Sequence, residues 1–405
     1  MPIPMAKRST ATTSMVSKVN QTAIIEALRF GGPLSRQQIG SMTGLSPATV
    51  NRLTASLIRE GLITREGQVP STGGRPSVLL RYAGSSRVVA AIQVRADRVI
   101  GALIDFDGEF VHRQEVSFSD LAHVSEQPNI LDDSRFRRML DLFDRLIATA
   151  DELATPCLAV GVSVPGVVQH PEGVVANLPE LGWPQFGLGE ILRSRSDIPV
   201  VIENDANALA YGELHRGVGR GVNSLVAVHL ENGLGAGIIT NGRLHRGFQY
   251  QAGEIGYLLM ERSSLAKSYP LLGDLEDRVG SVALTRTARE RGMPVEEGKL
   301  LVAEEIFGLA RLGDTIAAGM VSEILDMVSL AVAAMSIILD PELVVVGSGL
   351  AANSDVVIPG IIERLSGRII RVPRLASAAL AEDAVIVGVA ELAAHEVRGF
   401  TYLAG

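Results

Sequence analysis

Cysteine is almost absent from this chain. Cys157 is the only one in 405 residues, so no disulfide can form within the chain and a zinc cluster built from several cysteines is excluded. Disulfide-stabilised secreted proteins are therefore not a class to consider. The cytoplasm is the expected location.

Hydrophobic runs long enough for a membrane are also missing. The longest nearly uniform run extends from Met327 to Leu339, 13 residues that include Ser329 and Ser336, whereas a spanning helix needs roughly 18 or more. This run predicts a buried helix. Lys7 and Arg8 are followed by no apolar block, so we expect no signal peptide and no membrane partner.

Charge is unevenly distributed along a chain that is otherwise typical of a globular protein, with 47% hydrophobic and 20% charged residues. Its length predicts two or three domains. Residues 1–81 hold ten Lys and Arg against three Glu, a net charge of +7, whereas the whole chain carries −8 and the remainder therefore −15. A basic head on an acidic body favours contact between the head and nucleic acid.

The basic head has the pattern of a helix-turn-helix. Ser35 is a good N-cap for a short helix over Arg36–Met42, a turn follows at residues 43–45, and Ser46 caps the next helix with Pro47 in its first turn. The apolar stripe of that helix is Val50, Leu53, Leu57 and Ile58. Its opposite face offers side chains suited to base edges and phosphates: Ser46, Ala48, Thr49, Asn51 and Arg52.

Two strands after this helix predict a wing. Residues 62–64 and 78–80 flank a loop that contains Gly73-Gly74-Arg75-Pro76, and Arg75 at its tip is expected to enter a minor groove. A small helical module for protein interaction is the alternative interpretation of the head.

Beyond residue 84 a strand-hairpin unit occurs twice. Residues 88–94, 99–104 and 111–118 read as strands with a turn at Asp107-Gly108, and residues 225–230 and 236–240 read as strands before a turn at Asn241-Gly242. This repetition predicts a duplicated α/β fold with two lobes. A small ligand would sit in the cleft between them.

Several segments resemble the ROK family of repressors and sugar kinases. They are residues 161–166 (GVSVPG), 177–183 (NLPELGW), 203–207 (ENDAN) and 233–256, which contains GLGAG and AGEIG. The resemblance implies an α/β fold in which an N-terminal winged helix-turn-helix precedes a two-lobed actin-like (RNase H-like) ROK domain. Its repressor branch shares the recognition helix and the GGRP wing.

We therefore expect three regions. Residues 1–17 would be a flexible arm, residues 18–83 the winged helix-turn-helix DNA-binding domain, and residues 84–405 the sugar-sensing domain. Lobe one would comprise about 84–204 plus 386–405, and lobe two about 205–385.

The resemblance also implies a sugar site. Asn204 and Asp205 occupy the positions that bind sugar hydroxyls in the family, Asp205 that of its catalytic base, Glu254 that of another carboxylate, and Glu276 that of the glutamate closing the zinc loop. Hydroxyl-rich ligands need such acceptors. Tyr257 stands where the family has a histidine, so we include it among the sugar-binding residues.

The residues that handle phosphate and metal are replaced. Where the family's kinases carry an Asp-x-Gly-Gly-Thr sequence, this chain has Gln93, Arg95, Ala96 and Asp97, and Asn232 replaces a threonine. An amide cannot replace the metal carboxylate, and Asp97 would repel phosphate. We expect no enzyme activity and no cofactor.

A zinc ion is not expected either. The family's zinc loop uses one histidine and three cysteines, whereas this chain has Tyr257 and no cysteine after residue 268. Four scattered histidines have no ligand spacing and are expected to be surface or core polar residues: His112, His215, His229 and His245.

These observations favour a sugar-responsive regulator, most simply a repressor, that binds operator DNA as a homodimer or homotetramer and holds an unphosphorylated sugar in a catalytically inactive cleft. Two other hypotheses are an active sugar kinase with a DNA-binding head and a repressor gated by a partner protein.

Overall fold

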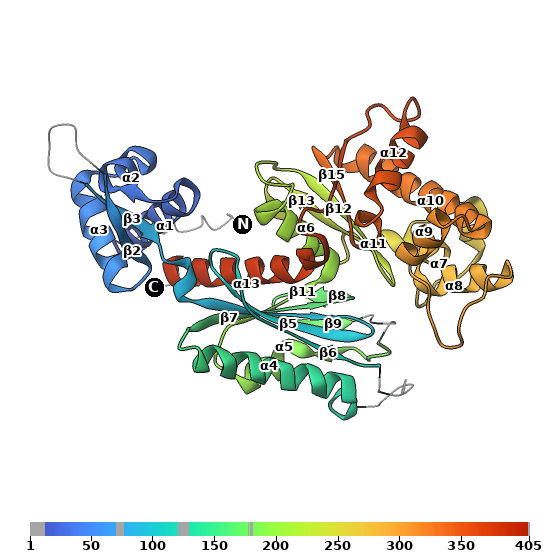
Figure 1. Cartoon of the computed structure of the whole chain (residues 1–405), viewed down its shortest axis with the longest axis horizontal. Coiled ribbons are helices and arrows are strands. Elements are labelled where there is room, and N and C mark those ends of the chain that lie inside the picture. The colour runs from blue at the N-terminus through green and yellow to red at the C-terminus, as the bar shows by residue number, and fades with distance from the viewer. Residues whose placement is uncertain are drawn as a thin grey trace, which may run out of the picture.

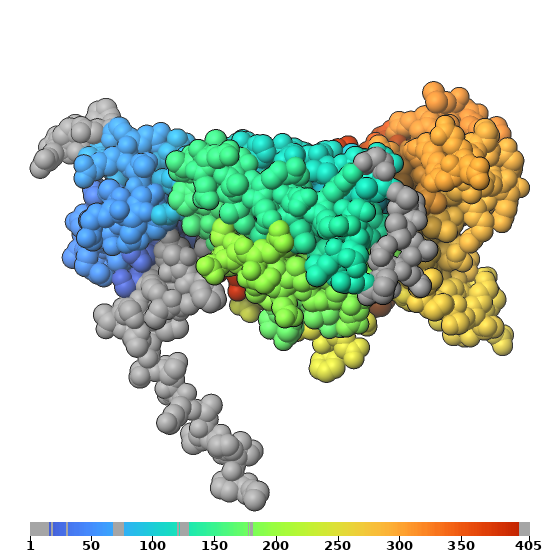
Figure 2. Space-filling model, turned by 90° about the horizontal axis from the view of Figure 1, so that it is seen from below, coloured from blue at the N-terminus to red at the C-terminus, as the bar shows by residue number. Residues whose placement is uncertain are grey.

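The computed structural model describes residues 13–69, 77–119, 121, 129–176, 178 and 181–403, arranged as a small head and two lobes (Figure 1). The head lies at one end of the molecule and the helices of the second lobe at the other, as Figure 2 also shows. One long helix, α13 (Ala384–Leu403), extends from between the lobes to the head (Figure 1).

The head is a three-helix unit with a small antiparallel sheet. Ser35 caps α2 through a capping box with Gln38, Gly44 ends that helix at φ 69°, and Ser46 caps α3 by accepting from Thr49 N. These features confirm the predicted helix-turn-helix. The elements are α1 (Thr13–Gly31), β1 (Leu34–Ser35), α2 (Arg36–Thr43), α3 (Pro47–Arg59), β2 (Ile63–Val69) and β3 (Ser77–Tyr82), in the sheet order β1-β3-β2.

The first helix corrects the predicted arm. α1 begins at Thr13, so residues 13–17 are helical, because no Gly or Pro in this stretch stops the helix that the apolar spacing from Ala23 indicates. The two strands of the predicted wing pair as expected, β2 with β3. The tip of the wing, with Arg75, lies outside the described residues.

Lobe one is built on a sheet whose middle strands are buried on both faces. Every residue of β4 is buried, since α4 covers one face of the sheet and α13 the other. The strand order is β11-β7-β4-β5-β6. Neighbouring strands among β4, β5 and β6 are antiparallel, whereas β7 and β11 run parallel to β4. The elements are β4 (Val88–Val94), β5 (Arg98–Asp105), β6 (Phe110–Ser117), α4 (Ser134–Glu152), β7 (Cys157–Val164), β8 (Val167–Gln169), β9 (Val174–Ala176), β10 (Phe186–Gly187), α5 (Leu188–Arg195) and β11 (Val200–Asn204).

Lobe two repeats this plan, which confirms the predicted duplication. Its sheet order is β14-β13-β12-β15-β16, again with three antiparallel strands followed by two parallel ones. Asn241 and Gly242 both have positive φ in the hairpin turn. The elements are α6 (Asp205–Arg216), β12 (Leu225–Leu230), β13 (Leu234–Thr240), β14 (Arg243–Leu244), α7 (Glu276–Val279), α8 (Ser281–Glu290), α9 (Ala303–Arg311), α10 (Thr315–Leu339), β15 (Leu343–Gly347), α11 (Ser348–Ala351), α12 (Ser354–Leu365) and β16 (Arg374–Ser377).

The apolar run from Met327 is the second half of a longer helix. Asp314 caps α10 by accepting from Ile316 N and Ala317 N, and this helix is long and apolar enough to cross a membrane by length and composition alone. Met320, Ile324 and Val328 instead pack in the core of lobe two.

Two helices join the lobes. α6 and α13 cross in backbone contact, because a Cβ on Gly388 would lie 1.8 Å from Ala208 O and one on Gly212 would lie 2.5 Å from Ala384 O. α6 also packs on β12 and β13 of lobe two, and α13 on β4 and β7 of lobe one. α13 starts at Ala384, ahead of the expected boundary of lobe one at residue 386.

Candidate ligand cleft and DNA-binding face

The exposed side of α3 carries the predicted DNA-reading residues. Ser46, Asn51 and Arg52 are exposed, and Thr49 is partly exposed. The hydroxyls of Ser46 and Thr49 hydrogen-bond to each other at 2.9 Å. Arg36 Nε donates to Thr54 Oγ1 at 2.9 Å, which fixes α2 against α3 and hence the angle of the reading face.

All five residues that the sequence analysis assigned to the sugar line one cavity of about 70 Å³ between the lobes: Asn204, Asp205, Glu254, Tyr257 and Glu276. Asn204 is the N-cap of α6, so its side chain accepts from Asn207 N at 3.1 Å while its amide donates to Asp205 Oδ1 at 3.0 Å and to Gly166 O at 3.2 Å. The end of β11 therefore fixes both side chains.

Glu254 reaches the cavity from the loop after β14, and Glu276 reaches it as the first residue of α7. Gly253 crosses β13 so closely that a Cβ there would lie 1.8 Å from Ala236 O, and Ala236 N donates to Gly253 O at 2.8 Å. Burial and the Asp205 charge raise the pKa of Glu254 to about 7. Burial and the Glu254 charge raise the pKa of Glu276 to about 7. Near neutral pH the two side chains can therefore donate as well as accept hydrogen bonds.

A histidine that sequence reasoning left out of the site lies in the same cavity. His229, 4% exposed at the end of β12, has Nε2 3.3 Å from Asp205 Oδ2 and Nδ1 2.6 Å from Ser348 Oγ. Among the described residues its Nε2 has no aligned hydrogen-bond partner. A lone histidine in a strand gives no spacing signal, because its partners come from α6 and α11.

Glu203, which precedes Asn204 in the chain, is the centre of a second cluster of polar side chains. Its carboxylate, 1% exposed, accepts from Arg246 at 2.6 and 2.8 Å and from Asn207 Nδ2 at 3.0 Å, and lies 3.5 Å from His170 Nε2. Burial alone would raise the pKa of Glu203, but His170 and Arg246 hold it below its usual value. This group joins β11 of lobe one to the loop after β14 of lobe two.

A larger cavity of about 1200 Å³ adjoins the first and contains the residues expected on the phosphate side. Gln93 is 3% exposed and, among the described residues, its Oε1 accepts no hydrogen bond. Asp97 pairs with Arg98 at 2.8 Å. Arg95 pairs with Glu231, and this contact connects the loop after β4 of lobe one to the end of β12 in lobe two.

This arrangement does not fit the metals of the resembled family. Gln93 offers an amide where the kinases carry the metal carboxylate, and Glu231 is engaged in an ion pair with Arg95, so these positions do not provide the carboxylate that a magnesium–phosphate complex needs. Zinc does not fit either, because no group of three or more His, Cys, Asp or Glu suited to a metal occurs among the described residues. Tyr257 instead donates its hydroxyl to Leu271 O at 3.2 Å.

Comparison with known proteins agrees with this two-part layout. Residues 89–396 match the ROK family, and residues 17–70 match the Crp-like helix-turn-helix domain. The chain is 26% identical over 343 residues to the xylose repressor of Caldicellulosiruptor bescii, which covers 83% of this chain and 84% of that protein. A glucokinase of Halalkalibacterium halodurans is 26% identical over 264 residues, covering 61% and 79%.

A solved structure has the same fold over almost the whole length. The crystal structure of a ROK family transcriptional regulator, a homologue of the Escherichia coli Mlc protein, covers 96% of this chain and all of that chain with a TM-score of 0.79 at 22% identity. The match to the ROK family thus covers both lobes, and the helix-turn-helix match covers the head. The chain belongs to the ROK family and carries a helix-turn-helix DNA-binding domain in front of its ROK domain, as a transcriptional regulator of that family does.

Proposed function

We propose that this protein is a sugar-responsive repressor of carbohydrate genes, and that it binds an unphosphorylated sugar without phosphorylating it. The observation that carries the proposal is the union of four acceptor side chains and Tyr257 around one cavity, beside a larger cavity in which Gln93 and the Arg95–Glu231 ion pair stand at the positions expected to handle phosphate. The xylose repressor among the relatives supports a sugar as effector.

Charge favours a neutral ligand. A phosphate beside Asp205 would face an ionised carboxylate, and two like charges ~4 Å apart repel by about 4 kcal/mol at an effective dielectric of ~20, roughly a thousandfold in affinity. A hydroxyl instead donates to that carboxylate and forms a charge-assisted hydrogen bond.

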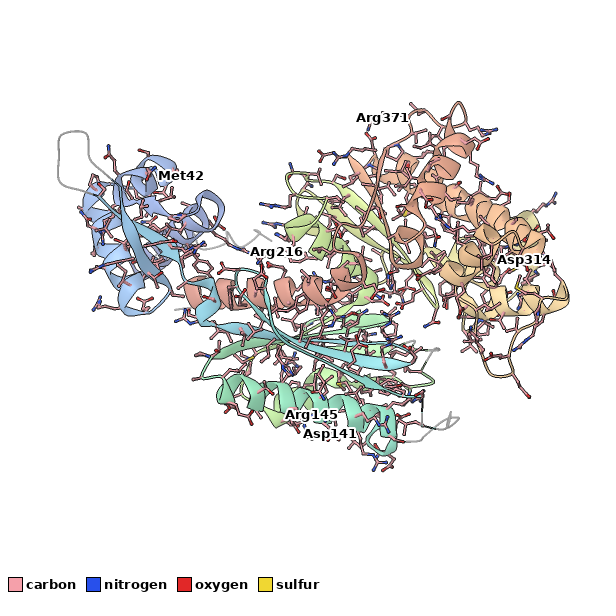
Figure 3. The ribbon with its side chains drawn as sticks, in the orientation of Figure 1. Met42, Asp141, Arg145, Arg216, Asp314 and Arg371 are labelled. Atoms are coloured by element: carbon pink, nitrogen blue, oxygen red, sulfur yellow. The ribbon has the colours of Figure 1, made fainter. Side chains whose placement is uncertain are left out.

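The cleft is connected to the DNA head through two helices. α6 begins with Asp205 in the cavity and ends with Arg216, which donates to Glu391 of α13 at 2.6 Å. Glu391, 6% exposed, also accepts from Arg29 of α1 at 3.1 Å. A sugar that prefers one position of α6 would therefore change the orientation of the head. Figure 3 labels Arg216 on the side of the lobes that faces the head.

DNA binding requires at least a pair of heads in this proposal. One recognition helix reads one half-site, so a homodimer or homotetramer would place two of them in successive major grooves of a near-palindromic operator inside the cell.

A titration of operator binding tests the proposal. The operator is first selected from random duplexes with the purified protein, and its affinity is then measured with D-xylose, D-glucose and their phosphates, alongside an ATP-consumption assay. We expect a response to a free sugar, a weaker one to its phosphate, and no turnover. Preference for the phosphate, or turnover above background, would reject the proposal. Loss of the response in Asp205→Ala with intact operator binding would support it.

A further inference from the structure

The loop between Tyr257 and Glu276 supplies one wall of the ligand cavity. Leu275 N donates to Gly256 O at 3.0 Å, and a Cβ on Gly273 would lie 2.1 Å from the same oxygen. The two ends of the loop therefore meet in backbone contact. The interior of the loop needs its own support, because Leu265 and Leu271 are exposed rather than packed in a core.

One buried carboxylate provides that support. Asp274 is 3% exposed, and its Oδ2 accepts from Met260 N and from Ser264 Oγ, both at 2.7 Å. Its Oδ1 accepts from Tyr269 Oη at 2.7 Å and from the Arg278 guanidinium at 3.1 Å. The four donors come from four separate points along the chain, so a single side chain crosslinks the whole loop.

The charge of this carboxylate is fully compensated. A buried ionised group is costly unless its oxygens are hydrogen-bonded and its charge is paired. Burial opposes ionisation of Asp274, but the four donors hold its pKa well below the usual range. Arg278 also reaches Glu261 at 2.8 Å, so the guanidinium ties the start of the loop to α7.

We propose that Asp274 is the positioning residue of the ligand cavity, and that its hydrogen-bond network does in this chain what a bound metal would do in the loop. Asp274 does not line the cavity. It acts through its neighbour Glu276 and through the loop that begins at Tyr257, and it holds both against the ligand. The effect on the ligand rests on the proposed function, whereas the order of the loop does not.

Asp274→Asn is the direct test, because the amide keeps the size of the side chain but turns one acceptor into a donor that faces other donors. We expect amide hydrogen exchange over residues 257–276 to rise at least tenfold, with the head unchanged. Affinity for D-xylose or D-glucose, whichever the wild-type protein binds by calorimetry, should fall at least tenfold. Operator affinity without sugar should stay within twofold.

Asp277→Asn is the matched control. Asp277 lies three residues further on, is partly exposed and pairs with Arg286 at 3.1 Å, so this variant should exchange like the wild type. Treatment of the wild-type protein with a chelator should also leave exchange in the loop unchanged.

Two outcomes would overturn the inference. One is an amide hydrogen exchange rate in the loop of Asp274→Asn equal to that of the wild type, and the other is faster exchange in the wild-type loop after treatment with the chelator. If Asp274→Asn does not fold, Ser264→Ala and Tyr269→Phe each remove one donor and should raise exchange in this loop alone; unchanged exchange in both would reject the inference. If the wild-type protein binds no sugar, the proposed function is rejected, but the hydrogen-exchange measurement still tests the role of Asp274 in the loop.

Discussion

Glu254 and Glu276 make the ligand-free cavity sensitive to pH. Their folded-state pKa values of about 7 lie above the ordinary 4.5. The folded protein therefore binds protons more tightly than the unfolded chain, and the stability this contributes is complete below about pH 4.5 and is lost as the pH rises through about 7.

This predicts that Glu276→Gln stabilises the ligand-free protein above pH 7, by up to about 3 kcal/mol, and reduces the fall in its unfolding free energy between pH 5 and pH 7. Chemical denaturation of both proteins across this range measures the difference. Parallel pH profiles would show that the carboxyl does not hold a proton in the folded state.

Arg52 is the residue for which we predict a direct effect on operator binding. Its side chain is exposed on the face of α3 that is predicted to read DNA, where a bidentate contact with guanine would be worth ~1–3 kcal/mol. Arg52→Ala should weaken operator binding by that amount, measured by fluorescence anisotropy. Arg145→Ala, on α4 at the far side of lobe one (Figure 3), is the control and should bind like the wild type. Equal affinities for the two variants would mean that α3 is not the reading element.

At the scale of single residues the sequence indicated which side chains share a cavity, but not which of them contact one another. The resemblance placed five residues that the fold brings to one cavity. It did not show that Arg95 faces Glu231, or that His229 lies beside Asp205, because both pairs join segments distant in sequence. Nor did any local pattern indicate the role of Asp274 as a fourfold acceptor.

Helices and strands could be predicted from the sequence where an apolar run ends at a clear turn signal. The strand before Asn241-Gly242 was predicted from its apolar run and the turn signal, whereas the short strand β14 after the turn was not. The starts of α1 and α10 were missed because only the uninterrupted apolar part of each helix was read as helical, although Asp314 is a recognisable N-cap for α10. The crossing of α6 with α13 depends on tertiary packing and has no local signal.

That crossing leads to a prediction for Glu391, which joins α13 both to α6 and to the head. Glu391→Gln removes the charge that pairs two arginines. We expect sugar affinity within about twofold of the wild type but a loss of most of the sugar-dependent change in operator affinity, since the coupling free energy of such systems is ~1–3 kcal/mol.

The control for Glu391 is on the same helix. Glu396 is exposed, and Glu396→Gln should respond to sugar like the wild type. An unchanged response in Glu391→Gln would show that the signal reaches the head by another route. Calorimetry with the sugar and anisotropy with the operator separate binding from coupling.

At the scale of the whole molecule, an apolar surface on lobe two bears on assembly. Leu330, Ile337 and Ile338 of α10 are 49%, 64% and 76% exposed. Under the proposed function a second copy of the chain would cover this surface, because a near-palindromic operator would need paired heads and the same surface can meet itself in a twofold dimer.

Ile338→Asp should therefore reduce the molar mass measured by light scattering towards that of one chain, and should weaken operator binding. Leu312, 86% exposed after α9, supplies the control Leu312→Asp, which should leave the mass unchanged. A wild-type protein that is already a single chain in solution would contradict the assembly part of the proposal.

The ion pair between Arg95 and Glu231 has a consequence for physiology. It lies in the larger cavity, at the positions that the resemblance assigns to phosphate handling in the kinases. Under the proposed function the protein consumes no ATP, so its response would follow the concentration of the sugar alone. Gene expression under its control would then stay insensitive to the ratio of ATP to ADP, in starved and in growing cells alike.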